Sequence, residues 1–275
     1  MELSPPPAVE SFRGQTAEGA SARFWGLGPE SLGLGPKNAT NSTSLVQRLM
    51  ATAATQKPLT LVDTTVGKKA LLAVSGVVLF GFVIGHMLGN LQVFLGPEVF
   101  NHYAESIKGN ALLLWGTRTL LLVAVVTHIA LVIQLYRRSL TARPIGYRVK
   151  KSIATTYAGA TMKYSGPALL LYILFHLAHF TMPGMALGNY EHSPVDVYSN
   201  FVNAFQLPWV TLLYVTANLL LGMHLYHGAF SLLQSLGLNH PRYNQRARLG
   251  ARFFAILVTT GNVVMPLSVM FGIIH

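Results

Sequence analysis

Four histidines lie inside long apolar stretches of this chain: His86, His128, His176 and His224. Ionisable side chains within a membrane span are costly and usually mark a functional site. Imidazole is also a common ligand of transition metals, including iron. Four histidines on four spans match the ligand number of two haems, each held by one histidine on either face. Such a haem has no open coordination position, so it transfers electrons and does not bind oxygen.

The apolar stretches are long enough to cross a bilayer. About 20 apolar residues span its hydrocarbon core, and five runs contain no Asp, Glu, Lys or Arg: residues 70–94, 119–136, 164–187, 207–238 and 253–274. Uninterrupted runs of this length favour helices over the strands of a membrane barrel. We therefore expect an all-α membrane protein with five transmembrane helices, the first four forming a haem-binding bundle.

Composition supports this class. Hydrophobic residues make up 51% of the chain and charged residues only 11%, whereas a soluble domain has about 25% charged residues. Residues 1–60 are rich in Pro, Gly, Ala, Ser and Thr and are expected to form a flexible cytoplasmic extension. Residues 61–275 are expected to form a transmembrane dihaem cytochrome b domain. The chain has no cysteine, which excludes thiolate-bound iron–sulfur clusters on it.

The net charge of +11 is distributed unevenly along the chain. Basic residues gather before the first apolar run, between the second and third, and between the fourth and fifth: Lys68, Lys69, Arg137, Arg138, Arg143, Arg148, Lys150, Lys151, Lys163, Arg242, Arg246, Arg248 and Arg252. The positive-inside rule then places the N-terminus in the cytoplasm and the C-terminus outside, in a multi-pass protein of the cell inner membrane. This pattern predicts contact with lipid headgroups or a docked soluble partner, and no nucleic acid.

Depth sorts the histidines into two pairs. At ~1.5 Å per helical residue, distances from the basic ends separate an outer pair, His86 with His176, from an inner pair, His128 with His224. His179 and His227 each follow a proposed ligand by three residues and lie near the same helix faces. By depth alone, His179 matches His86, and His227 matches His128, slightly better than His176 and His224 do. They could equally hydrogen-bond haem propionates or line a quinone pocket.

A short internal repeat accompanies the outer pair. Ser75 precedes His86, and Ser165 precedes His176 by the same interval, and a glycine follows each serine. That interval is close to three helical turns, so each serine shares a face with its histidine, about 16 Å nearer the cytoplasm. We expect Ser75 and Ser165 to lie beside the inner haem.

Residues 68–275 resemble the membrane cytochrome b subunit of succinate:quinone oxidoreductases and fumarate reductases, of the five-helix, two-haem type. The resemblance rests on four motifs: His86-Met-Leu-Gly-Asn-Leu, Phe100-Asn-His-Tyr-Ala, Ser165-Gly166 before His176, and His224-x-x-x-Gly228. It implies one haem ligand on each of the first four helices, at His86, His128, His176 and His224. Helix one would pair with three, and helix two with four. The resemblance places His179 and His227 after the ligand positions.

The resemblance also implies a function. A flavoprotein subunit would oxidise succinate, and an iron–sulfur subunit would pass the electrons to the membrane. The two b haems of this chain would relay them to a quinone, which in two-haem members is often menaquinone. The chain would thus be a non-flavin subunit of succinate dehydrogenase and would not be catalytic alone. Residues 1–60 lie outside the resemblance.

Three other functions are compatible with parts of this pattern. A dihaem cytochrome of a hydrogenase or formate dehydrogenase is one alternative. A bc-type cytochrome would place two ligands on one helix at a spacing that no apolar run here contains. A metal-ion transporter could use His176-x-x-His179, but it would want intramembrane carboxylates for cation binding, and the five runs contain none.

Overall fold

The computed structural model describes residues 60, 62–142, 145, 156–182 and 191–275. The predicted extension, residues 1–60, therefore lies outside the described residues except for Thr60. Residues 59–275 form one compact unit. Its described part is all-helical and contains no strand, which confirms the all-α class.

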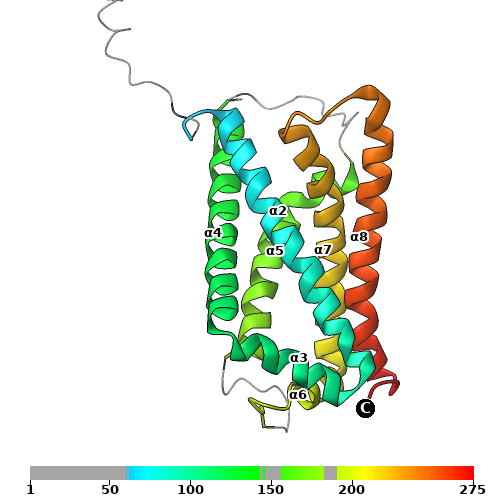
Figure 1. The fold of residues 1–275 in the computed structure, drawn as a ribbon. Coiled ribbons are helices and arrows are strands. Elements are labelled where there is room, and N and C mark those ends of the chain that lie inside the picture. Colours follow the sequence, from blue (N-terminus) through cyan, green and yellow to red (C-terminus); the bar gives the residue numbers. More distant parts are fainter. Residues whose placement is uncertain (1–59, 61, 143–144, 146–155, 183–190) are drawn as a thin grey trace, which may run out of the picture. The chain divides into compact units, whose positions relative to one another are not determined.

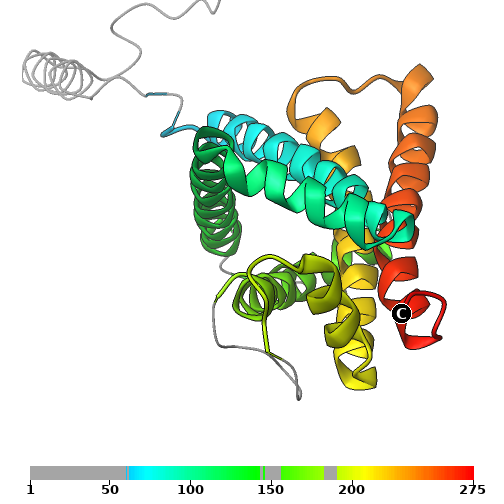
Figure 2. The ribbon, with the colours of Figure 1, turned by 60° about the horizontal axis from the view of Figure 1, so that its bottom comes forward.

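Long helices running up and down a common axis make up this unit (Figure 1): α2 (Thr65–Asn90), α4 (Ala111–Thr141), α5 (Tyr157–Phe180), α7 (Pro208–Ser235) and α8 (Pro241–Met270). Two shorter helices, α3 (Pro97–Gly109) and α6 (Val197–Phe205), lie across the end that holds the C-terminus (Figures 1 and 2). A 3₁₀ segment, η2 (Leu91–Leu95), connects α2 to α3. The sequence did not predict the two short helices, because neither is long or apolar enough to span.

Four helices are long and apolar enough to cross a membrane: α2 with η2, α4, α7 and α8. This confirms a multi-pass helical membrane protein for the described part of the chain. Helix α5 also has 24 residues, but its first half carries Lys163, Tyr164 and Ser165, and its second half carries two histidines. Its role as a fifth span stays a prediction.

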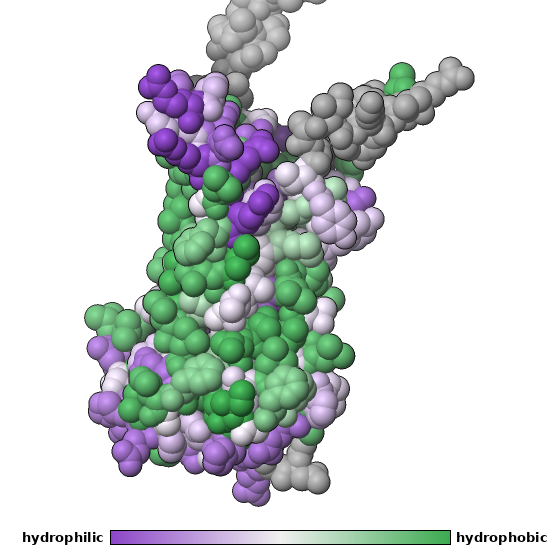
Figure 3. Space-filling model, turned by 90° about the vertical axis from the view of Figure 1, so that its right-hand side faces the viewer, coloured by the Kyte–Doolittle hydropathy of each residue, from purple (hydrophilic) through white to green (hydrophobic). Residues whose placement is uncertain are grey.

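The lateral surface of the unit is apolar. Figure 3 shows a broad hydrophobic belt between two hydrophilic ends. Large side chains such as Leu122, Leu171 and Phe253 point outward, with 63%, 68% and 70% of their area exposed. A helix that exposes this much apolar surface is stable in lipid, where apolar side chains need no burial against protein.

Most basic residues of the described segments lie at the ends of helices instead of in loops. Helix α8 begins at Pro241, twelve residues before the apolar run at 253, because His240 caps it and Pro241 suits its first turn. Its first half therefore carries the four arginines that the sequence placed in a loop. Arg137 and Arg138 likewise belong to the end of α4.

The helices that carry histidines pack as two couples. Helix α2 packs against α4, and α5 packs against α7, while α8 packs along α7 and touches α2. The backbones of α2 and α5 hardly approach each other, and neither do those of α4 and α7. The predicted ligands of each haem thus come from opposite couples, which meet directly where α2 contacts α7.

Candidate functional site

The structure brings the four predicted ligands together in two pairs. The ring centroids of His86 and His176 are 5.7 Å apart, with the planes nearly perpendicular at 83°. Those of His128 and His224 are 6.4 Å apart, at 51°. Metal–imidazole bonds are about 2.0 Å long, and the ring centre lies roughly 1.1 Å behind the nitrogen. Two imidazoles on opposite sides of one iron would then have centroids about 6.2 Å apart. The His128–His224 spacing is close to this value, and the His86–His176 spacing is about 0.5 Å shorter.

The two pairs lie at different levels of the bundle. Ser75 on α2 approaches His128, with 3.3 Å between its Oγ and the ring Nδ1. His86 lies on the same helix, three turns further toward the end covered by α3 and α6. At ~1.5 Å per residue, the pairs are about 16 Å apart along α2.

Ser75 offers the His128 ring a hydrogen-bond acceptor. Its hydroxyl donates to the carbonyl oxygen of Leu72 at 2.9 Å, and a hydroxyl has only one proton. The same oxygen can then accept from Nδ1–H of His128, the tautomer whose Nε2 is free to bind a metal. A Cβ at Gly76 would lie 3.8 Å from Cε1 of His128, which is an ordinary contact distance.

Ser165 does not repeat this arrangement. It is almost completely buried, and its two hydrogen-bonding contacts both go to Met162, to the carbonyl oxygen at 3.5 Å and the sulfur at 3.9 Å. A Cβ on Gly166 would have nothing within 4 Å. The repeat in the sequence is therefore not a repeat of contacts among the described residues.

His179 and His227 have other neighbours. His179 is 1% exposed, its Nδ1 lies 3.1 Å from the Tyr214 hydroxyl, and its ring packs against Phe180. His227 lies against α5, where a Cβ on Gly159 would come within 3.0 Å of its ring. Neither forms a ring contact with His86 or His128 in the described part of the chain. This geometry pairs His176 and His224 with the opposite helices, while the assignment of ligands stays a prediction.

Aromatic side chains surround the outer pair. Phe82 stacks on His86 at 5.2 Å, and Tyr172, Phe180 and Tyr214 all have centroids within 6 Å of His176. Tyr214 was not predicted from the sequence, although it lies ten residues before His224 on the same helix. That distance is about 15 Å, which places Tyr214 at the level of the outer pair.

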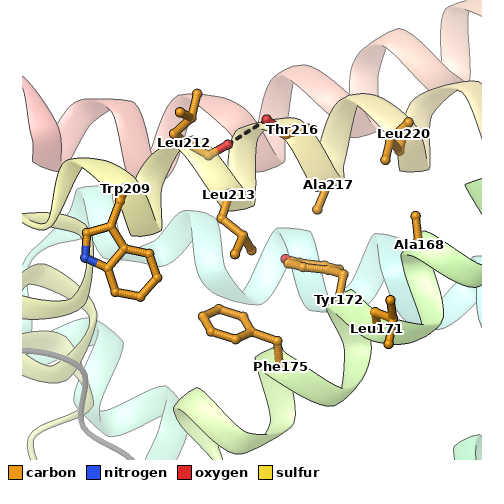
Figure 4. Close-up of a pocket in the computed structure, with 10 residues that line it drawn as sticks. All are labelled: Ala168, Leu171, Tyr172, Phe175, Trp209, Leu212, Leu213, Thr216, Ala217 and Leu220. Carbon is orange, nitrogen blue, oxygen red and sulfur yellow. Dashed lines mark hydrogen bonds between the residues drawn. The ribbon is translucent and has the colours of Figure 1, made fainter.

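An apolar groove runs between α5 and α7 beside this cluster (Figure 4). Its lining is Ala168, Leu171, Tyr172, Phe175, Trp209, Leu212, Leu213, Thr216, Ala217 and Leu220. The Thr216 hydroxyl donates to the Leu212 carbonyl at 2.8 Å, so it is satisfied within its own helix. Tyr172 belongs to both regions, since it faces the groove and its ring also packs on His176.

A polar network lies at the end of the bundle that α3 and α6 cover. Asn101 on α3 donates to Asp196 at 3.0 Å and accepts from the backbone N–H of Tyr198 at 2.9 Å. Hydrogen bonds from Ser199, and then from Asn101, lower the pKa of Asp196. Lys108 donates to the Pro194 carbonyl at 2.8 Å, and partial burial lowers its pKa. These bonds join α3 to the segment that leads into α6.

No family model, curated protein or solved structure matched this chain.

Proposed function

We propose that this chain is the membrane-anchor cytochrome b subunit of a succinate:quinone oxidoreductase. One b haem would bind between His86 and His176, and the other between His128 and His224. The observation that carries the proposal is the pair of cross-helix histidine contacts, at 5.7 and 6.4 Å, on two levels. Each pair supplies two histidines, the number that a bis-histidine haem requires.

Bound haem would supply one-electron transfer. The residues of the chain would hold the ligand nitrogens and orient the rings. The Ser75 hydroxyl would accept from Nδ1–H of His128 and leave Nε2 for the iron, and the two imidazoles of each pair come from different helix couples. Because the chain lacks cysteine, the clusters and the flavin would belong to an iron–sulfur subunit and a flavoprotein subunit. The electron acceptor would be a membrane quinone, with menaquinone the first to test.

Absorption spectroscopy of the full chain tests the haem prediction. The protein purified from membranes in detergent should give a b-type α-band in the dithionite-reduced minus oxidised spectrum. Its pyridine haemochrome should correspond to two haems per chain. A preparation without this band contradicts the proposal.

Co-purification then identifies the complex. Affinity capture of the chain, with the bound subunits identified by mass, should recover a flavoprotein and an iron–sulfur protein. The captured complex should also reduce a menaquinone analogue with succinate as donor. Recovery of hydrogenase or formate dehydrogenase subunits, with activity toward those donors only, would favour the alternative dihaem cytochrome.

A further inference from the structure

Tyr214 joins two histidines through one hydroxyl. Its oxygen lies 3.2 Å from Nδ1 of His176 and 3.1 Å from Nδ1 of His179. The side chain is 4% exposed, and its ring is fixed edge-on by Phe205 at 4.9 Å and by Tyr172 at 5.2 Å. The hydroxyl is therefore held in place between the two imidazoles by packing on several sides.

The proton count at this hydroxyl limits the states of the two rings. A hydroxyl carries one proton, so it can donate to at most one of the two Nδ1 atoms. At least one imidazole must then donate from its Nδ1 to the tyrosine oxygen. A neutral imidazole that donates from Nδ1 has a bare Nε2.

We propose that Tyr214 is the positioning residue of the outer haem: it accepts a hydrogen bond from Nδ1–H of His176 and thereby keeps Nε2 of His176 bare for the iron. This inference rests on the proposed function, because it concerns the ligand to that haem. The Tyr214 hydroxyl can then donate its proton to Nδ1 of His179. His179 anchors the hydroxyl from the other side and is not a ligand.

This direction leaves a buried donor on His179. With Nδ1 accepting from Tyr214, the proton of a neutral His179 is on Nε2, which is buried and has no hydrogen-bond partner among the described residues. A buried unpaired donor is costly, so this side chain is held at an energetic disadvantage that the fold must offset. An acceptor in the bound state, such as a carboxylate of the cofactor, would satisfy it.

The inner pair has an analogous device made from a different residue. Ser75 Oγ lies 3.3 Å from Nδ1 of His128 and can accept from its Nδ1–H, as Tyr214 accepts from Nδ1–H of His176. Partners that accept from a ligand histidine fix its tautomer and raise its basicity. A more basic ligand stabilises the oxidised iron, so each hydroxyl lowers the midpoint potential of its own haem.

The variant Tyr214→Phe tests the inference, because it removes the hydroxyl and keeps the ring. Redox titration of the purified full chain should show a more positive midpoint potential for one haem and no change for the other. Retention of that haem should also weaken, by about 10- to 100-fold in affinity. The affected signal should be the one that His176→Ala abolishes.

Tyr172→Phe is the matched control. Tyr172 packs on the same imidazole, and its hydroxyl lies near the Asn218 side chain. This variant should leave both potentials unchanged. Equal shifts from the two tyrosine variants would mean that packing and not the hydrogen bond sets the potential, which overturns the inference.

A second measurement does not depend on haem. Nitrogen-15 chemical shifts of His176 in the haem-free full chain should indicate the Nδ1–H tautomer, and Tyr214→Phe should change them. If the chain binds no haem, the proposed function fails while this measurement still decides the hydrogen bond. If the wild type binds two haems and Tyr214→Phe changes neither the potentials nor the tautomer, the inference fails and the proposed function stands.

Discussion

The imidazoles within each pair are held in different ways. His128 and His176 each have a hydroxyl against Nδ1, whereas His224 has a buried Nδ1 without a hydrogen-bond partner in the described segments. His86 is positioned by the stacked ring of Phe82. In each pair, therefore, one ring has an orientation fixed by a directional bond and the other relies on packing.

Alanine variants of the four histidines should separate the two haems. His86→Ala and His176→Ala should each remove one haem, and His128→Ala and His224→Ala should each remove the other, because each iron would lose one of its two axial ligands. Haem content per chain and the resolved α-bands measure this. His179→Ala and His227→Ala should keep two haems; loss of the same haem from all four ligand variants would contradict the pairing.

Asp196 should stabilise the start of α6 only at a pH where its carboxylate is ionised. Its side chain caps α6 by accepting from Ser199, and this bonding lowers its pKa below the usual value for an aspartate. A carboxyl whose pKa is lower in the folded state stabilises the fold above its unfolded pKa, near 4, and loses that effect as the pH falls through the folded pKa. Removing a cap of this kind costs about 1 kcal/mol.

Thermal unfolding of Asp196→Ala across pH checks this linkage. The variant should melt below the wild type at pH 7, and the difference should vanish as the pH is lowered well below 4. Glu191→Ala, which changes an exposed acid in the preceding segment, should show no such convergence. If the difference in melting temperature persisted unchanged at low pH, the ionised carboxylate of Asp196 would not be its source.

At the scale of the helices, Gly89 determines how closely α3 can approach α2. A Cβ at Gly89 would collide with the ring and hydroxyl of Tyr103 on α3, whereas a Cβ at Gly81 would have nothing within 4 Å. Gly89→Ala should therefore destabilise the protein by about 1–3 kcal/mol through overpacking. Gly81→Ala should be neutral or stabilising by up to about 1 kcal/mol. Melting temperatures in detergent compare the two variants. Equal melting temperatures would show that the Tyr103 side chain moves aside without destabilising the protein.

The long helices could be read from the sequence because a bilayer demands long apolar runs. Their ends could not, because a helix continues into water until a cap or a breaker stops it. This is why α8 begins at Pro241 and why its arginines are helical. Helices α3 and α6 escaped prediction because their stability comes from a shared core around Phe100, Phe201 and Phe205, and that core exists only after the chain has folded.

The histidine positions were predictable in part for a similar reason. Depth along a helix is a one-dimensional quantity, so sequence could place His86 with His176 and His128 with His224. The choice between His176 and His179 depends on rotation about the helix axis and on the neighbours of each ring. The Tyr214 hydroxyl, which contacts both rings, is a tertiary feature that no local pattern encodes.

Over the whole compact unit, positive charge gathers at the end opposite α3 and α6, and docking of soluble subunits should depend on it. Arg242 and Arg246 are exposed at the start of α8, whereas Arg248 lies over the ring of Phe230. The double variant Arg242→Glu/Arg246→Glu should lose co-purifying subunits and retain both haems. Arg118→Glu, at the opposite end beside Trp115, should keep the complex. Unchanged capture by the double variant would exclude this part of the surface from docking.

The two levels of histidine pairs have an electrical consequence. Their separation of about 16 Å is roughly half the ~30 Å hydrocarbon core. Moving one charge across the whole membrane potential is worth about 2.3 kcal/mol per 100 mV, so an electron passing between the pairs would experience about 1.2 kcal/mol of it. The equilibrium ratio of electron occupancy at the two levels would then change about sevenfold per 100 mV. The membrane voltage would therefore influence the direction in which electrons flow through the bundle.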